Sequence, residues 1–179
     1  MNQKFFCEKI KTLTLIAPRR VLLKKLREAL VLIERTDAKE RHRLLGRLKT
    51  IFITNKIGYT NEFFMPEKLW FANKSLILKN TTVWIASLIV HEAFHAAQFK
   101  KGRYIMPLAK LEKPALKKQA QFLKKLNRAD LVQDLKTAVK HEYRRKMQND
   151  KASFAHFRKL LTLLGKKELI LKKLQNFQV

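Results

Sequence analysis

The chain carries the segment SLIVHEAFHAAQ at residues 87–98, in which two histidines and a glutamate stand among apolar side chains. His91, Glu92 and His95 form an H-E-x-x-H motif. Residues four apart lie on one face of a helix, so the two imidazoles can meet one Zn²⁺ ion. Glu92 directly follows the first histidine and can take a proton from a water bound to that ion. The segment therefore predicts a zinc site with His91 and His95 as ligands and Glu92 as the catalytic base.

The alternative is that His91 and His95 are ordinary helix histidines and that Glu92 is a solvated carboxylate. The neighbouring residues argue against this, because burying these groups among apolar side chains leaves polar atoms unsatisfied unless something binds them. The apolar neighbours are Leu88, Ile89, Val90, Ala93, Phe94, Ala96 and Ala97. The metal interpretation is therefore favoured.

A third zinc ligand is also required, because a catalytic zinc site usually has three protein ligands and one position open for water. The sequence after the motif offers four candidates: Glu112, His141, Glu142 and His156. The residue types alone leave this choice open.

The motif, with strand-like segments before it and Glu112-Lys113-Pro114-Ala115 after it, resembles zincin-type metallopeptidases of the gluzincin-like group. Many bacterial and phage members of that broad group have an E-x-x-A helix after H-E-x-x-H, and Gln119 lies on the same face of such a helix. The resemblance covers roughly residues 50 to 126. It implies a zincin-like fold, hydrolysis of peptide bonds, and Glu112 as the third zinc ligand.

The chain departs from that group in two ways. Pro114 closely follows Glu112, so we expect Glu112 at the very start of its helix, where a missing amide is harmless. Leu116 stands where these peptidases often have an aspartate that contacts a ligand histidine. The related metzincin pattern is excluded, since Gln98 and Lys101 occupy the positions of its glycine and third histidine.

The expected mechanism is activation of a water molecule whose pKa zinc lowers toward about 7. Glu92 accepts its proton and passes it to the leaving amine, while another donor steadies the oxyanion. The candidate donors are Tyr104, Tyr143, His141 and His156. The alternative for each tyrosine is a packing residue with a solvated hydroxyl.

The resemblance also implies that an edge strand of a small sheet lies along the substrate cleft and pairs with extended peptide backbone. The two candidate segments are 68–72 and 75–78. For either one, the alternative is an ordinary hydrophobic strand of the core.

The first part of the chain predicts two helices. Pro18 is placed to open the first, which is expected to be amphipathic. Its apolar residues at helical spacing are Val21, Leu22, Leu26, Ala29, Leu30 and Ile33. Asp37 followed by Glu40 resembles a capping box and predicts a second helix. The apolar residues of that helix are Leu44, Leu45 and Leu48.

The middle of the chain predicts short strands over 51–53, 69–72 and 76–78, with a turn over 55–61 around Gly58. Thr81 or Thr82 can cap a buried helix that starts at Val83 and ends near Lys101, where Gly102 supplies a stop. Further helices are expected over about 112–126, 128–148, 151–163 and 166–177, separated by Asn127, Asn149, Asp150 and Gly165.

The predicted fold class is therefore α+β, a zincin-like domain with a small β-sheet, an active-site helix and flanking N- and C-terminal helices. The 179 residues are expected to form a single metallopeptidase domain, 1–179. Within it we expect basic N-terminal helices over 1–50, the catalytic core over 51–126 and basic C-terminal helices over 127–179.

The single cysteine, Cys7, excludes an internal disulfide and a multi-cysteine metal site, so a reducing cytoplasm suits the chain. The longest apolar run, Val83 to Val90, is far shorter than the roughly 20 residues that span a bilayer. The N-terminus lacks the features of a secretion signal. We therefore expect a cytoplasmic protein without a transmembrane segment, and the sequence leaves its oligomeric state unknown.

The formal net charge is +26, and it lies mainly on the flanks. Residues 1–60 hold fifteen basic and five acidic residues, 61–112 hold seven and four, and 113–179 hold eighteen and five. The competing function is therefore a basic helical module that binds nucleic acid or another polyanion, with histidines that are structural or bind metal without catalysis. Weak, salt-sensitive binding to nucleic acid or an anionic surface is expected in either case. The favoured function is a zinc metallopeptidase that acts on peptide or protein substrates.

Overall fold

The computed structural model of the chain describes residues 5–54, 62–64, 68–100 and 108–137. They form a five-stranded sheet with helices, so the predicted α+β class is confirmed. Contacts between Cα atoms divide the chain into two units, Met1–Leu135 and Lys136–Val179. Nearly all described residues belong to the first unit, and the single-domain organisation stays a prediction.

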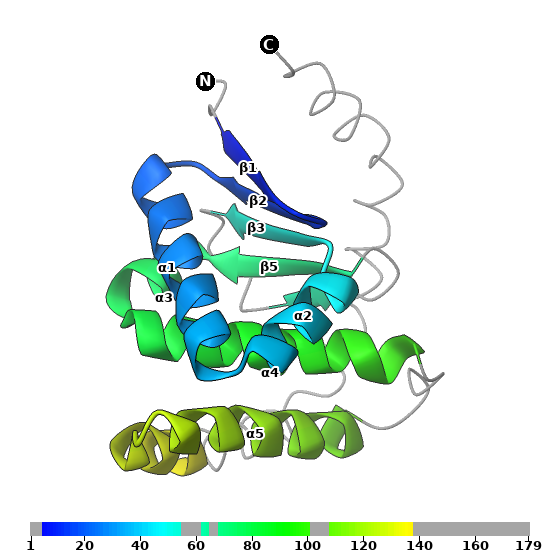
Figure 1. Cartoon of the computed structure of the whole chain (residues 1–179), viewed down its shortest axis with the longest axis vertical. Coiled ribbons are helices and arrows are strands. Elements are labelled where there is room, and N and C mark those ends of the chain that lie inside the picture. Colours follow the sequence, from blue (N-terminus) through cyan, green and yellow to red (C-terminus); the bar gives the residue numbers. More distant parts are fainter. Residues whose placement is uncertain (1–4, 55–61, 65–67, 101–107, 138–179) are drawn as a thin grey trace, which may run out of the picture. The chain divides into compact units, whose positions relative to one another are not determined.

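The strands and helices follow one another in a mixed order (Figure 1). The strands are β1 (Phe6–Ile10), β2 (Leu13–Ala17), β3 (Thr50–Thr54), β4 (Glu62–Phe64) and β5 (Leu69–Asn73). The helices are α1 (Arg20–Thr36), α2 (Ala38–Arg47), α3 (Lys74–Lys79), α4 (Thr82–Lys100) and α5 (Leu108–Lys125). Another helical stretch covers residues 129–137.

The sheet has the strand order β1-β2-β3-β5-β4. Its central strands β2, β3 and β5 run parallel, while β1 and β4 pair antiparallel at the two edges. Leu15, Ile51 and Trp70 stand side by side across the three central strands and are fully buried. They belong to the core that the sheet shares with α1 and α4, which places α4 under the sheet.

The N-terminal part of the chain contains a hairpin, which the prediction of basic N-terminal helices over 1–50 did not include. Residues 6–17 form β1 and β2, joined by a tight turn in which Lys11 has a φ of 53°. Leu13, Leu15 and Ala17 are buried. A short apolar run of this kind does not show by its periodicity whether it is strand or helix. Here the neighbouring strand β3, which begins more than thirty residues later, decides the matter.

Residues 76–78 lie in helix α3, so the strand predicted for them is wrong. Asn73 caps this helix, because its side-chain oxygen accepts a hydrogen bond from the Ser75 amide at 2.8 Å. A capped first turn outweighs the strand propensity of a short Leu-Ile-Leu run.

Neither segment predicted as an edge strand, 68–72 or 75–78, lies at an edge of the sheet. Residues 69–73 form β5, an interior strand between β3 and β4, and residues 75–78 are helical. The edge of the sheet at this side is β4, which pairs antiparallel with β5. Strand β4, Glu62–Phe64, was not among the predicted strands.

Helices α1 and α2 form where the sequence predicts them. Leu22, Leu26, Ala29, Leu30 and Ile33 are buried as expected, whereas Val21 is half exposed and the unpredicted Leu23 is buried. Asp37 caps α2, since its side chain accepts from the Glu40 amide at 2.9 Å. The Glu40 carboxylate, which a capping box would return to the cap amide, instead faces Lys118 of α5 at 2.9 Å.

Helix α4 is the central helix of the structure and packs against α1, α2 and α5. Thr81 caps it, with its hydroxyl oxygen 3.3 Å from the Trp84 amide. Its residues Ile85 to Val90 are all buried. The predicted stop at Gly102 lies outside the described residues.

Helix α5 begins earlier than predicted, at Leu108, so Pro114 and Glu112 lie within the helix and not at its start. The apolar residues Ala115, Phe122 and Leu123 are buried and explain why the helix persists through the proline. The helix ends as predicted at Asn127, whose φ is 56°. The amides of Asn127 and Arg128 bond back to the carbonyls of Lys124 and Leu123, which is a Schellman motif.

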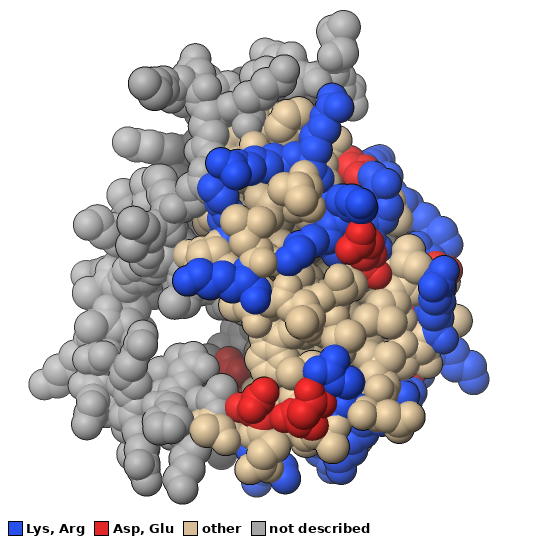
Figure 2. All heavy atoms as spheres, turned by 90° about the vertical axis from the view of Figure 1, so that its left-hand side faces the viewer, with Lys and Arg blue, Asp and Glu red and all other residues tan. Residues whose placement is uncertain are grey.

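Lys and Arg side chains spread over the described surface of one face, with few acidic groups between them (Figure 2). Among the described residues, no helix combines the length and apolarity that crossing a bilayer requires. The positive charge of this described face is therefore exposed to solvent, where polyanions can reach it.

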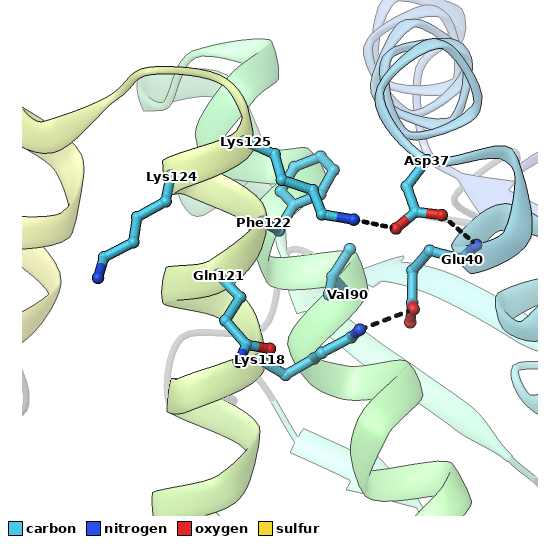
Figure 3. Close-up of a pocket in the computed structure, with 8 residues that line it drawn as sticks. All are labelled: Asp37, Glu40, Val90, Lys118, Gln121, Phe122, Lys124 and Lys125. Carbon is cyan, nitrogen blue, oxygen red and sulfur yellow. Dashed lines mark hydrogen bonds and ion pairs between the residues drawn. The ribbon is translucent and has the colours of Figure 1, made fainter.

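Two ion pairs fasten α5 to α2 beside a pocket of about 270 Å³ (Figure 3). Lys125 pairs with Asp37, and Lys118 pairs with Glu40. Glu40 is buried, so its pair with Lys118 satisfies a carboxylate that would otherwise be costly to bury. These contacts hold the helix that carries Glu112 against the N-terminal helices.

Candidate metal centre

The three motif residues rise from the middle of α4. His91, Glu92 and His95 are all buried, at 8%, 5% and 7% exposure. The helical repeat brings the two histidines to one face, with their rings 4.7 Å apart and nearly perpendicular. The face that carries both imidazoles is the one along which α5 packs, because Glu112 of α5 lies against both of them.

Helix α5 brings Glu112 to the two imidazoles. One carboxylate oxygen of Glu112 lies 3.3 Å from His91 Nε2, and the other lies 3.5 Å from His95 Nε2. The two Nε2 atoms are 3.0 Å apart. Of the four candidates for a third ligand, Glu112 is therefore the one that meets the histidines among the described residues; His141, Glu142 and His156 lie outside them.

These distances suit a shared metal ion. Donors about 2.1 Å from a tetrahedral zinc lie about 3.4 Å from one another, close to the spacing of these donors. Two imidazole nitrogens with one carboxylate oxygen are the donor set of a three-ligand site that keeps one position open. The group formed by His91, His95 and Glu112 could thus hold a metal ion.

A second polar residue orients His95. Its Nδ1 lies 3.0 Å from the side-chain oxygen of the buried Gln98, three residues further along α4. An amide oxygen only accepts, so Nδ1 carries a proton, and Nε2 is the nitrogen that can bind a metal once it gives up its own proton. The tautomer therefore follows from the hydrogen-bond partner.

His91 differs from His95 in this respect. Its Nδ1 is buried and has no hydrogen-bond partner among the described residues. The orientation of His91 consequently depends on packing and on its Nε2 contacts, whereas His95 is held at both nitrogens.

Electrostatic effects in the cluster favour an ionised Glu112. Burial by itself raises the pKa of this carboxyl, but hydrogen bonds from His91 and His95 outweigh burial and hold the pKa well below its usual range. For His95, burial lowers the pKa, while the hydrogen bond to Glu112 and the charges of Glu92 and Glu112 together raise it. Glu112 is therefore a carboxylate at neutral pH, the form in which it can ligate a cation.

Glu92 lies beside the ligand group without belonging to it. Its side chain is buried, and its negative charge raises the pKa of His95. Being next to His91 on α4, it points about 100° away from the ligand face. A buried carboxylate at the side of a metal site is placed to exchange a proton with a molecule bound there.

The remaining predicted donors, Tyr104, Tyr143, His141 and His156, lie outside the described residues. Gln98 was not predicted to belong to the site. A signal was available, because Gln98 follows His95 at helical spacing and is polar amid apolar neighbours.

Comparison with known proteins identifies no relative: no protein-family model, no curated protein and no solved structure matches the chain. The site is therefore understood from its own geometry and chemistry.

Proposed function

We propose that this protein is a zinc-dependent metallopeptidase of zincin-like type, with His91, His95 and Glu112 as zinc ligands and Glu92 as general base. The observation that carries the proposal is the convergence of two Nε2 atoms and a carboxylate within 3.0 to 3.5 Å, beside a further buried carboxylate. Two histidines with a purely structural role would not require Glu92, the second buried carboxylate.

The chemistry divides between the ion and the chain. A bound zinc ion would polarise the scissile carbonyl and lower the pKa of a water molecule to about 7. Glu92 accepts the proton of the attacking water and returns it to the leaving amine. Glu112 stays ionised, and Gln98 accepts from Nδ1 of His95, so the carboxylate and Nε2 of that ring face the place where the cation would bind.

The sheet supports a peptide as substrate. Strand β4 is the edge of the sheet and contacts α4. An edge strand offers backbone donors and acceptors to an extended peptide, whose scissile bond could then reach α4. In this proposal, strand β4 replaces residues 68–72 or 75–78 as the substrate-pairing edge strand that the resemblance implies.

The test measures zinc and hydrolysis together. Zinc per chain is determined by elemental mass spectrometry for the wild type, His95→Ala, Glu112→Ala and Glu92→Gln, and cleavage of a mixed peptide library is followed by mass spectrometry. We expect about one zinc per chain in the wild type and Glu92→Gln, loss in His95→Ala and a weakened site in Glu112→Ala. Of these four proteins, only the wild type should cleave at full rate.

His42→Ala is the matched control, because His42 is an exposed histidine of α2. It should keep both zinc and activity. A wild type that stays free of zinc after reconstitution contradicts the proposal. Zinc binding without cleavage of any library peptide would leave a metal site and refute the peptidase.

A further inference from the structure

A buried hydrogen-bonded pair joins α4 to α5 away from the metal ligands. The side-chain amide of Gln119 donates to the hydroxyl oxygen of Ser87 at 3.0 Å. Ser87 in turn donates to the carbonyl of Trp84 at 2.7 Å. Gln119 is 1% exposed and Ser87 is fully buried. The pair is therefore directional and shielded from water.

The pair lies on the same helix faces as the metal ligands. Ser87, His91 and His95 follow one another at intervals of four residues, so they share one face of α4. Glu112 and Gln119 are seven residues apart, which places them on one face of α5 two turns from each other. Since Glu112 meets His91 and His95 while Gln119 meets Ser87, the two helices run antiparallel with both contacts in one interface.

The apolar part of this interface does not fix its register by itself. Ala115, Phe122 and Leu123 are buried, but apolar contacts have no direction. A slip of one turn would move Glu112 by about 5.4 Å along α4, so that it could no longer contact both imidazoles. The same slip would separate Gln119 from Ser87 and leave buried polar atoms unpaired, which the folded state disfavours.

Pro114 makes a directional contact between α5 and α4 more important. It lies between Glu112 and Gln119 and cannot donate the helix hydrogen bond to the carbonyl four residues before it. The segment that carries Glu112 is thus less firmly joined to the rest of α5 by its own backbone. A register contact on the far side of the proline compensates for this.

We propose that Gln119 is a positioning residue, whose hydrogen bond to Ser87 sets the register of α5 on α4 and thereby holds Glu112 at His91 and His95. This inference rests on the proposed metal site. It adds to that site a residue that touches neither the ion nor the substrate.

The test is a double-mutant cycle. Gln119→Met keeps the side-chain length and removes the amide, and Glu112→Ala removes the ligand. Zinc dissociation constants are measured by competition with a chromogenic chelator for the wild type, both single variants and the double variant. We expect Gln119→Met to weaken zinc binding about 10-fold, the size of effect that a residue behind a ligand has. In the Glu112→Ala background the same change should have no further effect.

Leu123→Ala is the control for a merely structural role. Leu123 is fully buried on α5, so its truncation should lower the unfolding midpoint while leaving zinc affinity unchanged. Ser87→Thr, which keeps the hydroxyl, should retain zinc affinity, whereas Ser87→Ala should behave like Gln119→Met.

Unchanged zinc affinity in Gln119→Met, or equal weakening in both backgrounds, overturns the inference. If the wild type binds no zinc, the proposed function is refuted. The positioning role of Gln119 is then tested on the metal-free proteins, by comparing the urea midpoints of unfolding of the same four variants with chelator present. Residues this far apart normally have additive effects, so additive midpoint shifts overturn the positioning role and non-additive shifts support it.

Discussion

The two histidines of the candidate metal centre are held differently. His95 donates from Nδ1 to Gln98, while the buried Nδ1 of His91 has no partner among the described residues. A hydrogen bond behind a ligand imidazole fixes the ring and raises its basicity. Of the two candidate ligands, His95 is therefore the one whose ring orientation is already fixed by a hydrogen bond.

Replacement of Gln98 by methionine should weaken zinc binding about 10-fold, because His95 loses the acceptor that fixes its tautomer. Gln98→Glu should retain affinity, since a carboxylate accepts the same hydrogen bond. Competition titration with a chelator measures both. Gln121→Met, which replaces an exposed glutamine of α5, serves as control. Equal affinity in Gln98→Met and wild type would show that the hydrogen bond does not support the site.

At the scale of elements, α5 shows tertiary packing overriding local preference. Its interior proline disfavours a helix, yet the helix continues from Leu108 to Lys125. Buried side chains bind it to α4 and the core, and lysines add ion pairs with α2. The buried residues are Ala115, Gln119, Phe122 and Leu123, and the lysines are Lys118 and Lys125. The helix that completes the candidate site is therefore stabilised mainly by contacts with distant segments.

Pro114→Ala should raise the free energy of unfolding by up to about 3 kcal/mol, since alanine restores a backbone donor and removes the ring from the helix interior. Urea denaturation monitored by circular dichroism measures the change. Lys113→Ala, at the exposed neighbouring position, should stay within about 0.5 kcal/mol of the wild type. A less stable Pro114→Ala would mean that the proline is needed where it stands.

The cap of α2 predicts a pH dependence of stability. Hydrogen bonds from Lys125 and from the Glu40 amide lower the pKa of Asp37, although burial opposes them. Asp37 therefore stabilises the fold above its unfolded pKa of about 3.9, and this contribution is lost as the pH falls through the lower folded pKa. An asparagine at this position would still cap the helix, so Asp37→Asn isolates the charge.

We expect the wild type to exceed Asp37→Asn in unfolding free energy by less than about 1 kcal/mol at pH 6, with the difference vanishing toward pH 2. Urea midpoints across this range measure it. Lys125→Met should reduce the same pH dependence, whereas Lys124→Met should not, because Lys124 points away from Asp37 (Figure 3). A difference that grows on acidification would contradict the assignment.

At the scale of the whole molecule, the net charge of +26 governs how the chain interacts with charged partners. Basic side chains are spread over the described surface shown in Figure 2. The group formed by His91, His95 and Glu112, in contrast, lies on α4 and α5 and is largely shielded from solvent. The predicted attraction of polyanions and the proposed chemistry at this group therefore depend on different residues and can be tested separately.

Binding to a labelled DNA duplex should be weak, independent of sequence, and at least about 10-fold weaker at roughly 200 mM than at roughly 50 mM salt, because it depends on release of counterions. Fluorescence anisotropy with two unrelated duplexes measures this. His95→Ala should bind them like the wild type. Strong preference for one duplex at high salt would instead indicate a specific nucleic-acid site.

Local sequence determined the features whose interactions span one or two helical turns. These features are the shared face of His91 and His95, the caps at Asp37 and Thr81 and the end of α5 at Asn127. Each of them depends on contacts between residues only a few positions apart, so the local sequence is enough to predict it. The α+β class followed from the same local patterns.

Tertiary structure alone decided the features that depend on segments far apart in the chain. Residues 6–17 form strands because β2 pairs with β3. Residues 62–64 form an edge of the sheet because β4 pairs on the outer side of β5, which lies between β3 and β4. Glu112 reaches the histidines because α5 packs along α4 in one register, which Gln119 and Ser87 mark. The periodicity of a short apolar run does not reveal such partners, and residue types alone left Glu112 one of four candidates until the resemblance singled it out.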